Sequence, residues 1–227
     1  KYLLENKKHV FCEKPLCSSS SEAKDLKRYL AKGQVLQVGH SERCHEAWEL
    51  LKEDIKSITG PITVKLSRAA SFKGRATDVD VVQDLMIHDL DLCHYLFDKK
   101  LISVNAIGHK IRTDKWDHAT AFLKAEDGSI FEITSGRNHI KEIRSLEIMS
   151  SYGCIYVDLF TNEIFKANNT STEETGFVQS SKYEKRDHLN IEQNNFYKST
   201  LGQEKPMVTY EDGKYIVSLI DKVLESL

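Results

Sequence analysis

The chain has 227 residues, 40% hydrophobic and 29% charged, which is enough for a buried core in one large domain or two small ones. Its net charge of −2 and scattered lysines exclude the broad positive field of a nucleic-acid-binding protein, and no apolar run is long enough to span a membrane. The five cysteines form no Cys-x-x-Cys pair and no signal peptide is recognisable, which is typical of reduced thiols in the cytoplasm. We therefore expect a cytoplasmic protein whose partners include neither nucleic acid nor membrane.

The first part of the chain alternates predicted strands and helices. In chain order these are a helix tail over 1–8, a strand over 10–12, a helix from the caps at 18–21 through 32, a strand over 35–38 and a helix over 46–56. Pro15 stops the first strand, and Gly33 is suited to end the helix that precedes the second. This alternation predicts the closing part of a Rossmann-like parallel sheet.

After Gly60-Pro61 the pattern changes to a predicted sheet with a helix over 84–97. Further strands are predicted over 62–66, 102–111, 119–124, 130–134, 146–149, 155–159 and 164–166. Asp127-Gly128 marks a hairpin between two of them. Residues 168–185 are polar and predict a loop, and helices are expected over 188–201 and 215–227. The fold class is thus α/β, with an α+β part whose open, mainly antiparallel sheet has helices on one face.

The first motif with chemical content is Glu13-Lys14-Pro15, at the end of a predicted strand. Open α/β sheets bind their ligands outside the carboxyl ends of the strands, so Lys14 is well placed to contact one. Taken alone, however, a single lysine is more often a surface residue whose aliphatic part packs while its charge stays in water.

The second motif lies in the helix predicted over 84–97, where Asp84, His88, Asp91 and Tyr95 have offsets of one face. A polar stripe beside much apolar surface indicates partial burial, which with a nearby carboxylate can tune a histidine for proton transfer. Three other interpretations stay open: a solvated face, a His–Asp pair internal to the helix, or a metal pair at i and i+4.

Two further groups of residues are candidate ligand contacts. His40 and Arg43 follow the second predicted strand, with an ordinary surface loop as the alternative. Arg68 and Arg75 precede the second motif, and arginine pairs well with diphosphate oxygens. The alternative for that basic stretch is a solvated linker.

The segment His9–Leu16, together with Asp-x-x-x-His at 84–88, resembles the Gfo/Idh/MocA family of NAD(P)-dependent sugar oxidoreductases. In that family the Glu-Lys-Pro signature supplies the active-site lysine. The resemblance implies catalytic roles for Lys14, His88 and Asp84, contacts to NAD or NADP from Glu13, Lys14, Pro15 and His40, and substrate contacts from Arg43, Arg68, Arg75 and Asp91. It implies no metal.

The string from Arg68 to Asp91 looks most like the branch of the family that oxidises carbon 3 of UDP-N-acetylglucosamine. The resemblance then implies a nucleotide-sugar substrate and two domains. Residues 1–58 would be the C-terminal portion of the NAD(P)-binding Rossmann domain, and residues 59–227 the domain for substrate and oligomerisation. In this family the open sheet commonly packs on another subunit, which implies a homo-oligomer.

The sequence departs from the family pattern in one respect, because no Gly-x-Gly-x-x-Gly follows a predicted strand. We therefore expect the first part of the Rossmann domain, on the order of 90 residues at about 30 per βαβ unit, to be absent. The residue that distinguishes NAD from NADP would lie there. Three alternatives follow: a non-catalytic remnant that binds sugar or oligomerises, a member acting on another sugar or polyol, or a metal-dependent enzyme using Asp84 and His88.

Overall fold

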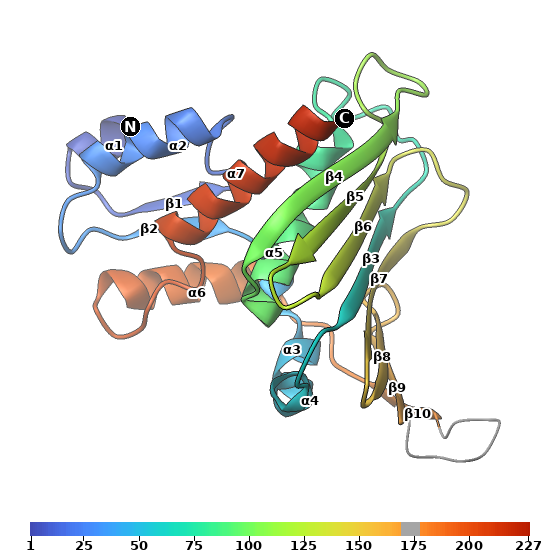
Figure 1. Ribbon diagram of the computed structural model, residues 1–227. Helices are drawn as coiled ribbons and strands as arrows, with labels where there is room; N and C mark the ends of the chain where they lie inside the picture. Colours follow the sequence, from blue (N-terminus) through green and yellow to red (C-terminus); the bar gives the residue numbers. More distant parts are fainter. Residues whose placement is uncertain (169–177) are drawn as a thin grey trace. The chain divides into compact units, whose positions relative to one another are not determined.

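The structure is a computed structural model that describes residues 1–168 and 178–227 (Figure 1). Its internal contacts divide it into two compact units, which are described separately. Unit 1 comprises Lys1–Cys44 and Arg186–Asp221, and unit 2 comprises His45–Lys185 and Lys222–Leu227. The domain boundary expected after residue 58 stays a prediction.

Unit 1 is built around two parallel strands, β1 (Val10–Glu13) and β2 (Leu36–Gly39), joined by α2 (Ser20–Leu26). Its other helical elements are α1 (Tyr2–Glu5), η1 (Lys27–Tyr29), η2 (Ser41–Cys44), α6 (His188–Thr200) and most of α7 (Tyr210–Ser226). A parallel pair needs a crossover connection, which α2 supplies. The β-α-β order predicted for this part of the chain is confirmed.

The core of unit 1 joins segments that are far apart in sequence. Val38 is fully buried, and its backbone N–H donates to the carbonyl of Val208 at 3.2 Å. The hydroxyl of Tyr210 donates to the carbonyl of Ala23 at 2.7 Å. At Gly213 in α7 a Cβ atom would lie 2.7 Å from Val38, so the absent side chain lets the helix approach β2 closely.

Unit 2 is an eight-stranded mixed sheet in the order β10-β9-β8-β7-β3-β6-β5-β4. Its strands are β3 (Thr63–Ala69), β4 (Leu101–His109), β5 (His118–Ala125), β6 (Ile130–Gly136), β7 (Ile143–Ser150), β8 (Gly153–Asp158), β9 (Glu163–Asn168) and β10 (Val178–Lys182). Within this sheet, among the described strands, only the β3–β6 pair is parallel, so the expected mainly antiparallel sheet is confirmed.

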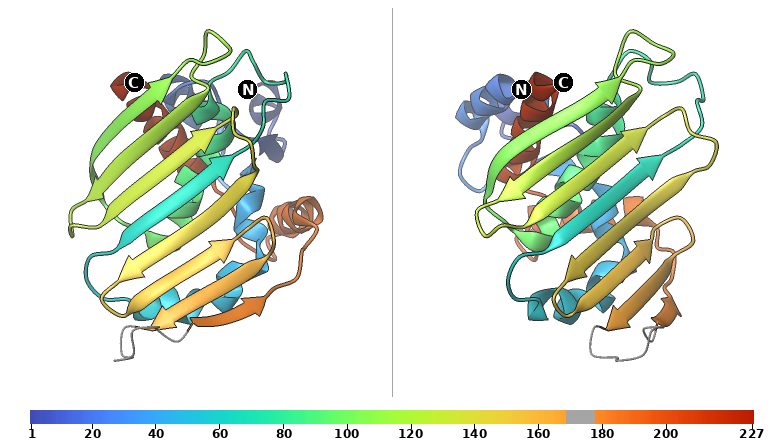
Figure 2. Two further views of the ribbon diagram at one scale, coloured as in Figure 1. Left: turned by 90° about the vertical axis from the view of Figure 1, so that its right-hand side faces the viewer. Right: turned by 45° about the vertical axis from the view of Figure 1, so that its right-hand side comes forward.

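One face of this sheet packs on the helix α5 (Ile87–Phe97), and the other is turned toward the viewer in the left view of Figure 2. Val64 and Leu66 point to the helix side and are buried, whereas the alternating Lys65 is exposed. The rings of Phe97 in α5 and Phe131 in β6 lie 5.7 Å apart. The predicted one-sided cover of the sheet by a helix is therefore present.

Several predicted boundaries were wrong. The helix expected to run through Lys32 gives way after Leu26 to the short turn η1, and Leu30 is extended and packs on the core. The helix expected over 46–56 is split at Leu51 into α3 (Glu46–Leu50) and α4 (Lys52–Ser57). Leu51 is fully buried at that break.

The loop expected over 168–185 is also partly wrong. Residues 178–182 form β10, an edge strand paired with β9, while 169–177 lie outside the described residues. At the end of this pair Lys182 lies opposite Glu163 and forms an ion pair with it at 3.2 Å. The strand is polar because it is an edge, so it lacks the apolar alternation by which strands are recognised.

Candidate active site

In unit 1 the carboxyl ends of β1 and β2 place the Glu13-Lys14-Pro15 motif. Glu13 is the last residue of β1 and lies opposite Gly39, the last residue of β2. A Cβ atom at Gly39 would lie 3.0 Å from a carboxylate oxygen of Glu13, so glycine is what leaves room for this side chain. Lys14 follows half-buried, and the Lys14-Pro15 peptide bond is cis. The motif lies at the strand edge where open α/β sheets bind ligands.

The segment after β2 is more buried than a surface loop. His40 is 1% exposed and Arg43 is 7% exposed. Arg43 donates from Nη1 to the carbonyl of Met207 at 3.0 Å, and its Nη2 lies 3.7 Å from a carboxylate oxygen of Asp212. Arg43 therefore ties η2 to the start of α7 within unit 1, and the ligand contacts expected of both residues stay predictions.

In unit 2 the helix that carries Asp84 and His88 begins earlier than predicted and is not regular. A π-helical turn, η3 (Val82–Met86), precedes α5, so Asp84 lies in the wide turn and His88 in the first turn of the α-helix. Such π turns occur often at functional sites. Residues predicted on one face have different environments: Asp91 is fully buried, whereas Tyr95 is 44% exposed.

Beneath this helix lies a buried ion pair, of which only Arg68 is among the predicted site residues. Arg68 of β3 donates from Nε to both carboxylate oxygens of Asp89, at 3.1 and 3.2 Å, and from Nη2 to Oδ1 at 2.9 Å. The two side chains are 6% and 3% exposed. This bidentate contact fixes α5 on the sheet at the residue that follows His88. A substrate contact for Arg68 stays a prediction, and Asp89, which adjoins His88, is not among the predicted site residues.

Arg75, the other expected substrate arginine, lies in an irregular segment between β3 and η3 and is exposed. Its neighbours Gly74 and Ala76 have positive φ angles of 66° and 54°. A left-handed alanine is unfavourable, so this turn is held by its surroundings. Of the predicted substrate residues in unit 2, Arg68 and Asp91 are buried and Arg75 is open to solvent.

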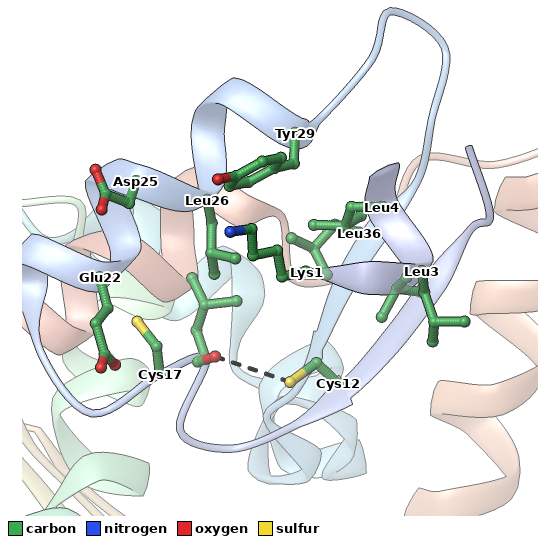
Figure 3. Close-up of a pocket in the computed structure, with 12 residues that line it drawn as sticks. Lys1, Leu3, Leu4, Cys12, Cys17, Glu22, Asp25, Leu26, Tyr29 and Leu36 are labelled. Carbon is green, nitrogen blue, oxygen red and sulfur yellow. Dashed lines mark hydrogen bonds between the residues drawn. The ribbon is translucent and has the colours of Figure 1, made fainter. Parts of the chain in front are cut away.

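Unit 1 also contains a cavity of about 440 Å³ lined mostly by apolar residues of α1, α2 and β1 (Figure 3). The thiols of Cys12 and Cys17 lie on its wall. Burial raises the pKa of both thiols, which makes them poor nucleophiles. Neither Glu13 nor Lys14 is among the lining residues, so this cavity is distinct from the strand ends.

Across residues 1–168 and 178–227, no three His, Cys, Asp or Glu side chains are grouped so as to hold a metal ion. Over the same residues, no helix combines the length and apolarity that crossing a membrane requires.

Comparison with known protein families gives two matches. Residues 1–40 match the model described as "Oxidoreductase family, NAD-binding Rossmann fold", and residues 58–156 match the "GFO/IDH/MocA C-terminal domain". The chain belongs to the Gfo/Idh/MocA family of oxidoreductases. The α/β fold expected from the sequence and the NAD-binding character of the family are thereby confirmed.

Two individual proteins of known function are similar to this chain. The chain is 33% identical over 161 residues to UDP-N-acetylglucosamine 3-dehydrogenase from Acidithiobacillus ferrooxidans, a match that covers 69% of this chain and 50% of that protein. It thus spans about half the length of that relative. It is 25% identical over 236 residues to myo-inositol 2-dehydrogenase from Thermotoga maritima, covering 94% of this chain and 68% of that protein.

Solved structures show the same fold. A structure of the Acidithiobacillus ferrooxidans UDP-N-acetylglucosamine 3-dehydrogenase superposes with a TM-score of 0.91 at 26% identity, over 100% of this chain and 73% of that one. A levoglucosan dehydrogenase in complex with NADH superposes with a TM-score of 0.86 at 18% identity, over 98% of this chain and 72% of that one. The second likeness concerns the fold alone.

Proposed function

We propose that this chain carries out, or forms part of an enzyme that carries out, the NAD-dependent oxidation of a sugar hydroxyl to a ketone. The substrate we propose is UDP-N-acetylglucosamine, oxidised at carbon 3. The observation that carries the proposal is the Glu13-Lys14-Pro15 motif at the ends of two parallel strands, in a chain 33% identical over 161 residues to a UDP-N-acetylglucosamine 3-dehydrogenase. Asp84 and His88, on the helix fixed by the Arg68–Asp89 pair, supply the second half of the chemistry.

The cofactor fits the residues at the strand ends. Gly39 has no side chain, which leaves room for the carboxylate of Glu13 at the carboxyl edge of β1 and β2, the edge at which open α/β sheets bind ligands. Lys14, Glu13, Pro15 and His40 are the residues of this chain that we propose hold NAD or NADP. When bound, this cofactor accepts the hydride that leaves the sugar carbon.

Side chains of this chain accept the hydroxyl proton and stabilise the charge that its removal creates. His88 takes the hydroxyl proton as general base, and Asp84, in the preceding turn, orients the imidazole and favours its protonated form. The ammonium of Lys14 stabilises the negative charge that develops on the substrate oxygen. Arg43, Arg68, Arg75 and Asp91 are proposed to bind the nucleotide-sugar substrate.

The first test is calorimetric titration of the chain with NAD, with and without UDP-N-acetylglucosamine, followed by an assay of NADH formation. We expect micromolar binding that strengthens with the sugar. Lys14→Met and His88→Asn are each expected to lower kcat/KM by about 10²- to 10⁴-fold. Lys52→Met and His109→Asn, at exposed positions, are the matched controls and should leave it unchanged.

The same variants test the division of roles. We expect His88→Asn, and not Lys14→Met, to remove the ascending limb of the pH–rate profile, because a general base must be deprotonated to act. The reverse result would assign the base to Lys14. If the chain neither bound NAD nor turned over sugar, it would not carry out the reaction by itself, and only a role as part of a larger enzyme or as a non-catalytic relative would remain.

A second candidate substrate is a cyclic polyol, because the match to a myo-inositol 2-dehydrogenase covers 94% of this chain. A polyol has no diphosphate, so it would make no use of the exposed Arg75. We therefore expect Arg75→Ala to raise KM for UDP-N-acetylglucosamine and to leave any turnover of myo-inositol unchanged. Turnover of myo-inositol alone would favour the polyol.

We also propose that the open face of the eight-stranded sheet is covered by a second copy of the chain. Three of its side chains are large, apolar and exposed: Ile107 is 67%, Phe122 41% and Ile130 44% exposed. The strand register places them on one face, because Ile107 lies opposite Thr120 and Ile130 opposite Lys124. Large exposed apolar side chains that share one face of a sheet are typical of an interface.

A further inference from the structure

Residues 70–81 connect β3 to η3 without helix or strand, yet hydrogen bonds hold both of their ends. The N–H of Ala70 donates to the carbonyl of Gly136 at 3.0 Å, and the N–H of Val81 donates to the carbonyl of Trp116 at 3.0 Å. The exposed Arg75 lies between these two fixed points. The direction of the Arg75 side chain therefore depends on the contacts that hold the middle of the segment.

A buried guanidinium holds the middle of the segment, in addition to an ion pair between Lys73 and Glu142. Arg137, the residue after β6, is 7% exposed and points under the segment. Its Nη1 donates to the carbonyl of Ala76 at 2.5 Å and to that of Val79 at 2.9 Å. Its Nη2 donates to Oγ1 of Thr113 at 3.0 Å. Only the planar, multiply donating head of arginine can make these contacts together, and lysine cannot.

Asp117 in turn fixes Arg137. The carboxylate is fully buried, and Oδ1 accepts from Nε of Arg137 at 2.7 Å and from the hydroxyl of Thr113 at 2.8 Å. Oδ2 accepts the backbone N–H groups of Ile111, Arg112 and Thr113 at 2.7, 2.6 and 2.9 Å. Burial alone would raise the pKa of Asp117, but these hydrogen bonds outweigh it and hold the pKa well below the usual range.

The contact from Arg137 falls on a strained residue. Ala76 has a φ of 54°, which an alanine adopts only where its surroundings require it, and Arg75 directly precedes it. A return of Ala76 to negative φ would turn the chain and redirect the Arg75 side chain. The cation of Arg112 lies over the ring of Phe72 at 5.1 Å and adds a second contact on the same segment.

We propose that Arg137 is a positioning residue for substrate binding: with Asp117 it holds segment 70–81 in the conformation that presents Arg75 to the substrate diphosphate. This inference rests on the proposed function for the identity of the ligand. The competing interpretation is that the buried Arg137–Asp117 pair serves folding alone. The two differ in whether loss of the Arg137 contacts weakens ligand binding through Arg75.

The local effect is measured by hydrogen exchange on the whole chain. Arg137→Lys keeps the charge and loses the planar guanidinium with its several N–H donors. We expect it to speed hydrogen exchange about tenfold at the amides of Val81 and Trp116. Exchange in the strands β7 and β8 should stay unchanged. Lys99→Met, which removes a surface pair with Asp127 on the β5–β6 hairpin, is the matched control and should alter neither region.

The effect on binding is measured by titrating UDP-N-acetylglucosamine into Arg137→Lys, Arg75→Ala and the double variant. We expect each single variant to weaken binding about tenfold, and the double variant to bind no more weakly than Arg75→Ala alone, because both changes remove the same contact. Additive losses, or binding that Arg137→Lys leaves unchanged, would overturn the inference and leave the pair a structural one.

Two further outcomes are separable. If the unchanged chain does not bind UDP-N-acetylglucosamine, the proposed function fails, and with it the role of Arg137 in binding. If Arg137→Lys does not fold, Thr113→Val is used instead, because it removes one contact to Arg137 and one to Asp117 and keeps both charges. The same non-additivity with Arg75→Ala is then expected, and its absence overturns the inference.

Discussion

At the scale of single residues, the buried pair of Arg68 and Asp89 joins fold and chemistry. The pair is desolvated, so its net contribution to folding is small, but removal of either charge would leave the other buried without this charged contact. Both carboxylate oxygens of Asp89 accept from Arg68, and His88 is its neighbour in the chain. The pair therefore sets where the candidate base lies relative to the sheet.

We predict that Asp89→Asn lowers the free energy of unfolding by about 3–5 kcal/mol, because it leaves Arg68 charged and buried. Urea denaturation measures this change. The control is Asp127→Asn in the surface pair with Lys99, which should cost less than about 1 kcal/mol. Equal, small losses in both variants would show that water reaches Arg68 and that the pair is not a buried one.

At the scale of elements, the end of the sheet at which β5 begins and β6 ends brings two histidines together. His118 lies opposite Gly136, and Nδ1 of His118 lies 3.3 Å from Nε2 of His139, with the rings stacked. A Cβ atom at Gly136 would lie 2.6 Å from His139, so only glycine permits this approach. Burial, then the neighbouring His139 and His109, lowers the pKa of His118.

This lowered pKa predicts that stability falls in mild acid. With a folded pKa below the ordinary value of about 6.5, the unfolded chain binds more protons as the pH drops through and below that value. The free energy of unfolding should therefore decrease from pH 7 to pH 5, and His118→Gln should make this decrease shallower. Denaturation at a series of pH values measures it, with the exposed His9→Gln as control. An unaltered slope in His118→Gln would contradict the prediction.

The elements found from the sequence alone are those whose burial follows a simple period. Alternation along Val64 and Leu66 in β3, and the glycine turn between β5 and β6, identified the sheet because side chains there point alternately to core and solvent. The polar edge strand β10 has no such period. Its pairing is made by the backbone, which sequence patterns do not report.

Helix ends and buried networks were less predictable, for different reasons. Helix α7 starts at Tyr210 and not at 215, because Thr209 and Asp212 cap it reciprocally: each backbone N–H donates to the other's side chain, at 2.8 and 3.2 Å. This capping signal is visible in the sequence at Thr209 and Asp212 and places the helix start before residue 215. Arg137 and Asp117 are 20 residues apart and meet only because β5 and β6 pair, so no local pattern indicates their contact.

At the scale of the whole molecule, the motifs at 13–15 and 84–88 were identified by resemblance. No sequence pattern, however, predicted which segments of the chain make up unit 1. Residues 186–221 pack with residues 1–44 in that unit, and the hydrogen bond between Val38 and Val208 is one of the contacts between these two segments. Contacts over such sequence separations depend on the completed fold. The candidate site residues thus came from short motifs, and their supporting contacts came only from the structure.

The proposed dimer face yields the last prediction. Phe122 is 41% exposed and lies on the open face between Asn105 of β4 and Glu132 of β6. Phe122→Glu would set a charge beside that glutamate and in the proposed interface, where burying it unpaired is costly. We therefore expect the variant to be monomeric in light scattering and sedimentation, at concentrations where the parent chain is oligomeric.

The matched control is Ile140→Glu. Ile140 is fully exposed, at 100%, but lies in the turn between β6 and β7 and not on the sheet. It carries the same change of charge and apolar surface, so it should leave the oligomer intact. A monomeric parent chain, or equal dissociation by both variants, would contradict a specific interface on this face. Loss of the oligomer in Phe122→Glu alone, with an unchanged free energy of unfolding for the monomer, assigns the apolar surface to association, because Phe122 then contributes nothing to the fold itself.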